Sequence, residues 1–114
     1  MKRGDVVIVD FSPTTPSAGI RPAVVVQNDR DNGRMRNTIV AQVTSNIRRA
    51  QEDTQLLIDQ NHADWQQSGL RLASVINCSN LATVRQTDVR RVIGSLSSAT
   101  LQKIDNCLRA ALEL

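Results

Sequence analysis

The fold of this chain depends on one segment above all, Arg21-Pro22-Ala23-Val24-Val25-Val26-Gln27. Its run of β-branched residues is typical of a strand that is buried on both faces. The proline opens this strand, at a position where a missing backbone N–H is tolerated, and it holds Arg21 in an extended conformation. An earlier run at residues 6–10 has the same character. The two runs predict two strands joined by the turn-rich segment between them.

The remainder of the chain adds more short strands and a single helix. We predict strands at residues 38–44, 55–58, 70–76, 82–84 and 92–96. Polar loops are predicted at residues 28–33 and 59–69, and one helical turn at 87–91. Beyond Ser97, the expected N-cap, apolar residues recur at three- and four-residue steps, which predicts one helix with a single apolar stripe.

Several short strands followed by one helix predict a mainly β (α+β) fold, in the form of a small, strongly bent antiparallel sheet or barrel. Alternation within residues 38–44 puts Ile39, Ala41 and Val43 on one face of that strand. A chain of 114 residues with 40% hydrophobic and 22% charged residues has a globular composition. We therefore expect a single domain over residues 1–114.

The composition excludes several classes of function. Aromatic residues make up only 2% of the chain, so stacking of bases on aromatic platforms is excluded as the main binding mode. Two cysteines and one histidine exclude a zinc site of clustered Cys and His and also a disulfide framework, which favours a reducing cytoplasm. The apolar runs are too short to cross a bilayer, and residues 1–5 lack the apolar core of a signal peptide, so we expect no membrane partner.

The net charge of +3 is spread unevenly along the chain. Residues 1–50 carry eight Lys and Arg against four Asp and Glu, whereas residues 51–114 carry six against seven. Twelve of the 14 basic residues are arginines, whose planar guanidinium suits phosphates and carboxylates. Two interpretations stay open at this point: an anionic partner for the N-terminal half, or a solvated basic surface.

No familiar catalytic set is present. Asp59, His62 and Asp64 are close in sequence, but their spacing matches no metal-binding signature, so we expect a solvated loop and no metal. For Cys78, a small buried residue is favoured over a reactive thiol. Trp65 could be a binding anchor, but the favoured interpretation is a hydrophobic pin for its own loop.

Two positions do not resemble packing residues. Arg21 lies at a junction of loop and strand just after a glycine, where its head can point outward. Thr44 closes a strand whose other face is apolar, and it shares its own face with Gln42. Taken alone, each also fits a plainer interpretation, as a surface arginine and a threonine at the end of a strand.

An ordered set of segments resembles a known family. The segments are Lys2-Arg3-Gly4-Asp5-Val6, Asp10-Phe11-Ser12-Pro13, Arg21-Pro22-Ala23-Val24-Val25-Val26-Gln27-Asn28-Asp29, Thr38-Ile39-Val40-Ala41-Gln42-Val43-Thr44-Ser45, Arg91-Val92-Ile93-Gly94-Ser95-Leu96-Ser97 and Ile104-Asp105-Asn106-Cys107-Leu108. Together they are similar to the MazF/PemK-type toxins over nearly the whole chain. The resemblance implies a bent, SH3-like β-barrel with a C-terminal helix (CcdB/PemK-like). It also implies a homodimer whose shared groove holds RNA and is blocked by an acidic antitoxin.

The resemblance further implies a metal-independent endoribonuclease without a cofactor. In this family the 2′-OH of single-stranded RNA attacks the adjacent phosphorus and leaves a 2′,3′-cyclic phosphate and a 5′-OH. The catalytic arginine and threonine of the family match Arg21, which would stabilise the phosphorane, and Thr44, which would hydrogen-bond the scissile phosphate. The positions implied to bind RNA are Ser12, Ser17, Gly19, Asn28, Ser45, Asn46 and Asn80.

The sequence departs from the family pattern in two places. The loop before Arg21 is shorter, reads Ser17-Ala18-Gly19-Ile20, and lacks the usual acidic and amide residues, so we expect a different cleavage motif. An arginine of the family is replaced by Ala82, which implies weaker RNA binding or compensation from Arg48 or Arg85.

Two alternatives of another class stay open. One is a CcdB-like toxin that binds DNA gyrase and catalyses nothing. Arg21 and Thr44 argue against it, because a gyrase poison does not need them. The other is a catalytically inactive relative that only pairs with an antitoxin.

Overall fold

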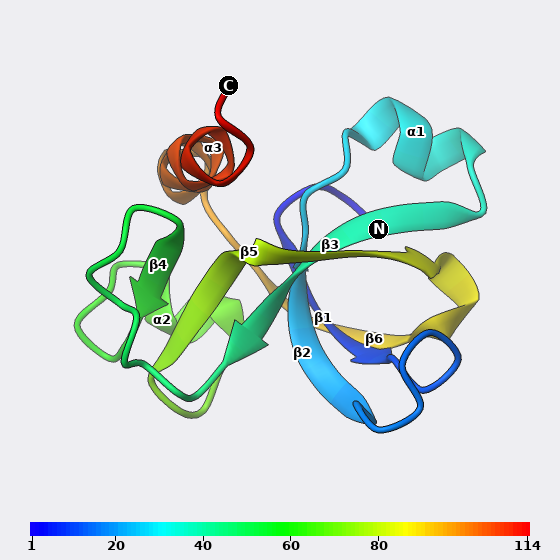
Figure 1. Cartoon of the computed structure of the whole chain (residues 1–114), viewed down its shortest axis with the longest axis horizontal. Coiled ribbons are helices and arrows are strands. Elements are labelled where there is room, and N and C mark those ends of the chain that lie inside the picture. The colour runs from blue at the N-terminus through cyan, green and yellow to red at the C-terminus, as the bar shows by residue number, and fades with distance from the viewer.

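Six antiparallel strands form one sheet in the order β4-β5-β3-β2-β1-β6, and a C-terminal helix covers part of it (Figure 1). The computed structural model describes all 114 residues. The strands are β1 (Asp5–Asp10), β2 (Ile20–Val25), β3 (Asn37–Thr44), β4 (Gln55–Ile58), β5 (Ser74–Arg85) and β6 (Val89–Ser95). The helices are α1 (Asp29–Arg34), α2 (Trp65–Ser68) and α3 (Ser98–Leu112), with a 3-10 turn, η1 (Gln86–Asp88).

The sheet bends strongly but does not close. Strands β4 and β6 are its two edges and do not pair with each other, so the predicted barrel is an open sheet within the expected mainly β class. The 12-residue strand β5 pairs with β3 along its length, but the register breaks once. Ala41 of β3 faces Leu81, whereas the next residue, Gln42, faces Asn77. Residues 78–80 therefore form a β-bulge, which bends the strand at this point.

Two apolar clusters hold the sheet, one on each face. The first cluster lies under α3 and consists of Val6, Val24, Ala41, Val43, Ile58, Ile76, Cys78, Leu96, Ile104 and Cys107. The second cluster occupies the opposite face and consists of Val7, Val9, Phe11, Ala23, Val25, Val40 and Val84. Because successive side chains of a strand point to opposite faces, β1, β2 and β3 contribute to both clusters. The buried runs of β1 and β2 confirm the prediction that these two strands are covered on both faces.

Helix α3 begins where the sequence predicted it. Ser97 is its N-cap and accepts a hydrogen bond from the Thr100 backbone N–H. Ile104 and Cys107 of the helix are buried against the sheet in the first apolar cluster. The half-buried Trp65 side chain packs against this cluster and fixes its own loop there. The Arg3 guanidinium also donates to the Asp105 carboxylate at 2.6 Å and ties the N-terminus to the helix. No helix of the protein is long and apolar enough to span a bilayer.

Four local predictions were wrong. The segment 59–69, expected to be a loop, contains the short helix α2, which ends at Gly69 in the left-handed conformation. The segment 28–33, expected to be a loop, forms most of α1, because the Asn28 side chain caps the helix by accepting from the Asp31 N–H at 2.8 Å. The strands expected at 70–76 and 82–84 are one strand, β5, because the polar residues between them bulge instead of turning. The helical turn expected at 87–91 is η1, and β6 already begins at Val89.

A buried carboxylate anchors the start of α3 to α2. Asp64 is 3% exposed and accepts hydrogen bonds from the Ser97 backbone N–H at 2.8 Å and from its hydroxyl at 2.9 Å. Burial alone would raise the pKa of Asp64, but hydrogen bonds from Thr100 and Ser97 outweigh it and lower the pKa. The ionised carboxylate is therefore the form that stabilises this junction.

We expect Asp64→Ala to lower the free energy of unfolding by about 2 kcal/mol at pH 7, since it leaves the Ser97 donors without their acceptor. The lowered pKa gives a stabilisation that is complete above the unfolded-state pKa of about 4 and is lost as the pH falls through the folded-state value. The difference from wild type should therefore narrow below about pH 4. Urea unfolding at several pH values measures the difference in the free energy of unfolding between wild type and Asp64→Ala. Asp53→Ala, at an exposed aspartate, is the control. Equal losses for both variants at pH 7 would show that the anchor contributes nothing.

Candidate functional site

Arg21 and Thr44 lie at the same end of the β2–β3 pair. The pairing of these strands ends at Ala23 and Gln42, and Arg21 and Thr44 follow beyond it and line the same two cavities. The exposed Arg21 side chain donates from Nε to the Ala18 carbonyl oxygen at 2.7 Å. This bond orients the guanidinium and leaves both Nη groups without a partner in the protein. The half-buried Thr44 Oγ1 accepts from the Asn46 backbone N–H at 3.1 Å, so its own proton is free to be donated.

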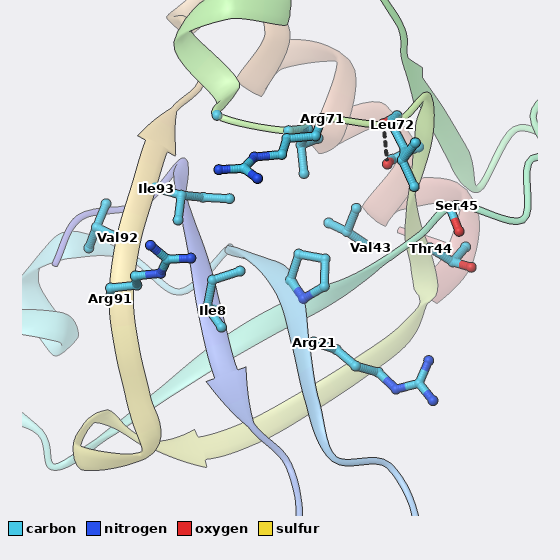
Figure 2. Close-up of a pocket in the computed structure, with 14 residues that line it drawn as sticks. Ile8, Arg21, Val43, Thr44, Ser45, Arg71, Leu72, Arg91, Val92 and Ile93 are labelled. Carbon is cyan, nitrogen blue, oxygen red and sulfur yellow. Dashed lines mark hydrogen bonds between the residues drawn. The ribbon is translucent and has the colours of Figure 1, made fainter.

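Two cavities meet at this pair of residues. The larger, of about 670 Å³, has an apolar wall formed by Ile8, Pro22, Val43, Leu70, Leu72, Val92 and Ile93 (Figure 2). The smaller, of about 300 Å³, is polar. Arg21, Val43 and Thr44 line both. The larger cavity is also lined by Arg71 and Arg91, which have no acidic partner (Figure 2). Arg21 and Thr44 thus lie where a cavity of mixed apolar and basic lining meets a polar one.

A close approach of α2 to β6 shapes the larger cavity. Gly69 ends α2 with a φ of +72°, and a Cβ there would lie 2.1 Å from the Ile93 carbonyl oxygen. Only glycine allows both the left-handed backbone and this contact. The approach places Leu70 and Leu72 across from the edge strand, where Leu72 is 66% and Val92 52% exposed. An exposed apolar surface of this kind marks an interaction site.

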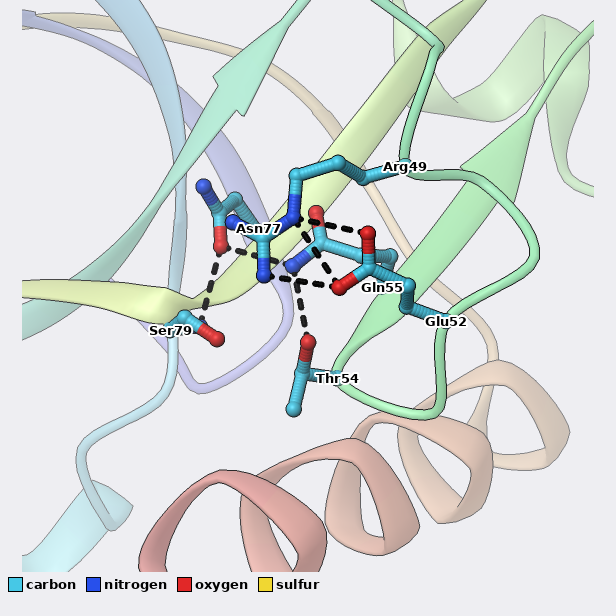
Figure 3. A network of polar contacts seen from close by, with 6 residues as sticks. All are labelled: Arg49, Glu52, Thr54, Gln55, Asn77 and Ser79. Atoms are coloured by element: carbon cyan, nitrogen blue, oxygen red, sulfur yellow. Dashed lines mark hydrogen bonds and ion pairs between the residues drawn. The ribbon is translucent and has the colours of Figure 1, made fainter.

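The polar cavity contains carboxamides and arginines but no carboxylate. Its polar lining residues are Gln42, Asn46, Gln55, Asn77, Asn80, Arg21, Arg48, Arg49 and Thr44. Arg49 forms a two-pronged ion pair with Glu52 at the rim, with Nη2 to Oε1 at 2.9 Å (Figure 3). The hydrogen bonds from Arg49 lower the pKa of Glu52. Arg21 and Arg48 have no acidic partner, so the cavity is electropositive and suits an anion.

The structure brings three of the other predicted RNA-binding residues to these cavities. Ser45 lines the larger cavity, while Asn46 and Asn80 line the polar one. Ser17 and Gly19 lie in the β1–β2 loop outside both cavities, near Arg21 in sequence. They stay predictions.

Ser12 and Asn28 are not brought to the cavities. The hydroxyl and the backbone N–H of Ser12 both donate to Asp10 Oδ1, at 2.6 and 2.9 Å. These bonds, with the ion pair from Arg90, lower the pKa of Asp10 to about 2. Asn28 caps α1 at the far end of β2 from Arg21. Both side chains therefore have local structural tasks.

Several cavity residues were not singled out from the sequence as RNA-binding, namely Gln42, Gln55, Asn77 and Arg49. The alternation of β3 places Gln42 on the same face as Thr44, which was a usable signal. Gln55 and Asn77 sit on other strands, and only the sheet register brings them beside Gln42.

The candidate metal and thiol residues have structural surroundings. No three His, Cys, Asp or Glu side chains cluster in a way that could hold a metal ion. His62 Nδ1 accepts from the Asp64 N–H at 3.0 Å, within the loop before α2. Cys78 and Cys107 are buried, and burial raises the pKa of Cys78 to about 12, so its sulfur is a packed thiol at neutral pH.

Comparison with known proteins agrees with this geometry. The model of the "PemK-like, MazF-like toxin of type II toxin-antitoxin system" family matches residues 2–112. Endoribonuclease EndoA of Bacillus subtilis is 33% identical over 100% of this chain and 96% of its own length. Endoribonuclease MazF of Staphylococcus saprophyticus is 31% identical over 100% of this chain and 92% of its own.

Solved structures share the fold. A mycobacterial endoribonuclease in complex with its cognate antitoxin superposes with a TM-score of 0.80 at 23% identity, covering 100% of this chain and 96% of that one. The Mycobacterium tuberculosis toxin MazF-mt6 superposes with a TM-score of 0.79 at 22% identity, covering 96% of this chain and 97% of that one.

Proposed function

Because the chain belongs to the PemK-like, MazF-like toxins of type II toxin–antitoxin systems, we propose that it is a metal-independent, sequence-specific endoribonuclease acting on single-stranded RNA. Both curated relatives are endoribonucleases by name. The observation that carries the proposal is that Arg21, with two free Nη groups, and Thr44 line one electropositive cavity. Since the substrate is RNA, the protein acts in the cytoplasm.

The reaction needs few groups from the protein. The substrate's 2′-OH attacks the adjacent phosphorus, the bond from phosphorus to the 5′ oxygen breaks, and the products carry a 2′,3′-cyclic phosphate and a 5′-OH. The nucleophile belongs to the RNA, so the protein has to align the strand and stabilise charge on the phosphorane. The free Nη groups of Arg21 supply a fixed cation, and the Thr44 hydroxyl donates to a phosphate oxygen. No cofactor enters the reaction.

Arg48 offsets the missing arginine at position 82. Ala82 packs against the second apolar cluster and contributes no charge. Arg48 lines the polar cavity beside Arg21, whereas Arg85 lines a separate depression with Pro13 and Thr87. Arg48 is therefore the cation placed to hold the RNA backbone next to the scissile phosphate.

The protein acts as a homodimer. The apolar wall of the larger cavity, with Leu72 and Val92 more than half exposed, lies directly beside Arg21. A second copy laid on this surface by a two-fold axis would cover it and bring two Arg21–Thr44 pairs to one groove.

An acidic antitoxin neutralises the enzyme. The unpaired Arg21 and Arg48 attract carboxylates for the same reason that they attract phosphates. The mycobacterial neighbour of known structure is bound to its own cognate antitoxin. A segment that presents acidic side chains would occupy the site of the RNA and prevent cleavage.

Purified protein should cleave a mixed RNA pool at discrete sites in EDTA and leave 5′-OH ends. Arg21→Ala, which removes the fixed cation, should cleave about 10²- to 10³-fold more slowly while it stays folded. Mapping of 5′-OH ends measures the first result and time courses the second, with Arg85→Ala as the matched control. If the RNA stays intact and DNA gyrase is inhibited, the protein is a CcdB-like toxin. If the RNA stays intact and gyrase is not inhibited, the protein is a catalytically inactive relative.

Thr44→Val keeps the shape of the side chain and removes only the hydroxyl. Turnover should fall by about 10-fold or more, because one charge-assisted hydrogen bond to the phosphate is lost. Stability should change little, since a strand end tolerates valine. Single-turnover rates and thermal melting measure the two effects. Full activity, or an unfolded variant, would make Thr44 a structural residue.

Charges placed on the apolar surface should separate the dimer. The double variant Leu72→Glu and Val92→Glu should stay folded, because both side chains are exposed, and should become monomeric at micromolar concentration. Light scattering measures the mass, and Leu114→Glu, at an 82% exposed leucine elsewhere, is the control. A monomeric wild type, or a dimer that survives both charges, contradicts this interface.

A further inference from the structure

Three carboxamides form a row across the sheet next to Thr44. Gln42 of β3 faces Asn77 of β5, and Asn77 faces Gln55 of β4 on its other side. All three line the polar cavity, on the face of the sheet opposite α3, because their neighbours Val43 and Ile76 point into the first apolar cluster. The row exists because the bulge at 78–80 shifts the register at this point.

One backbone N–H sets the orientation of two of these amides. The Ser79 N–H donates to the Asn77 side chain at 3.0 Å, and a backbone N–H can only donate, so Oδ1 must face it. Asn77 Oδ1 also accepts from the Gln55 side chain at 2.9 Å, which requires Gln55 to present Nε2 (Figure 3). The second Nε2 proton goes to Thr54 Oγ1 at 2.9 Å.

This network leaves one donor and one acceptor unused. No hydrogen bond of the protein involves Asn77 Nδ2, and none involves Gln55 Oε1. Gln55 is only 6% exposed, and no fully buried side-chain polar atom of the protein lacks a partner, so its oxygen faces the cavity that it lines. The protein thus holds a fixed donor and a fixed acceptor on two side chains that are hydrogen-bonded to each other, already oriented before any ligand binds.

The surroundings suit a nucleobase attached to a phosphate chain. Arg49 is held by Glu52 at the rim and offers a flat guanidinium on which a base can stack. This matters because Phe11 is buried in the second cluster and Trp65 packs on the first, so no aromatic ring lines the cavity. Thr44 lines the same cavity, so the base belongs to a nucleotide adjacent to the scissile phosphate.

We propose that Gln55 and Asn77 form a subsite that reads one unpaired base of the RNA and selects an amino base, adenine or cytosine. The exocyclic amino group of the base would donate to Gln55 Oε1, and the neighbouring ring nitrogen would accept from Asn77 Nδ2. The subsite rests on the proposed ribonuclease function and gives that function its choice of sequence. Gln55 and Asn77 act as specificity residues and take no part in the bond-breaking step.

Asn77→Asp tests the subsite, because it changes only the unused atom. The carboxylate keeps an acceptor for the Ser79 N–H and for Gln55 Nε2, and it replaces the free donor by an acceptor. Two adjacent acceptors fit guanine, whose N1–H and N2 amino group are neighbouring donors. The preference at one position should therefore move from the amino bases adenine and cytosine towards guanine, with adenine and cytosine losing about 10- to 100-fold relative to wild type.

The measurement is selection from a random single-stranded pool with 2′-fluoro sugars, which lacks the nucleophile and stays uncleaved, in EDTA. The result is expressed as the ratio of the four bases at each position of the selected RNAs. A loss of affinity that the added charge causes equally for all bases does not change this ratio. Asn37→Asp is the matched control, since it makes the same change at the exposed opposite end of β3. Thermal melting checks that each variant is folded.

The expected result is a switch at one position for Asn77→Asp and an unchanged profile for Asn37→Asp. Identical profiles for wild type and Asn77→Asp would overturn the subsite, as would a wild type without any base preference. Cleavage of an all-ribose pool by wild type is scored separately, so the base-reading subsite and the ribonuclease activity can fail independently.

Discussion

The pairing of β5 with β3, interrupted once by a bulge, is the constraint on which the rest of this structure depends. Before the interruption Val43 and Ile76 meet in the apolar cluster under α3, and after it Val40 and Val84 pack on the opposite face. Without the bulge, β5 would pair with β3 residue for residue, and the sheet would be flatter. Strand β5 would then have no extra residues on the face that lines the polar cavity. The bulge therefore bends the sheet and also exposes Asn77 and Asn80 at the cavity.

The site follows from where two strands end. Arg21 and Thr44 sit at the end of β2 and β3, beyond the last buried pair, so their polar heads reach solvent while their backbones stay in the sheet. The sheet fixes the backbones of both residues, and the proposed alignment of a phosphate depends on such fixed positions. The larger cavity combines apolar residues with Arg71 and Arg91, and the smaller one is polar. In the proposed function, the apolar part of the larger cavity contacts a second copy and the polar cavity contacts RNA.

The proposed reaction explains how this enzyme can work without a set of specialised catalytic side chains. When the nucleophile is a hydroxyl of the substrate, neither a histidine pair nor a reactive thiol is needed, and the chain's single histidine and buried cysteines take structural places. The same lack of aromatic residues that excludes stacking platforms leaves base recognition to hydrogen bonds and to arginine. Carboxamides on a sheet are suited to this, because neighbouring strands can lock them in one orientation.

The sequence by itself determined the fold class, the helix from Ser98 to Leu112 and the identity of Arg21 and Thr44 as candidate residues, because periodicity, caps and ordered motifs are local properties. The sequence did not reveal that Asn28 starts a helix. A capping signal at Asn28 and a turn signal at Asn32-Gly33 lie within a few residues of each other, and they predict different structures. It also did not reveal the row of Gln42, Asn77 and Gln55, which lie on three strands. Only the tertiary structure decided which amides meet, because strand register is set by packing across the whole sheet and one residue of slip would turn each side chain to the other face.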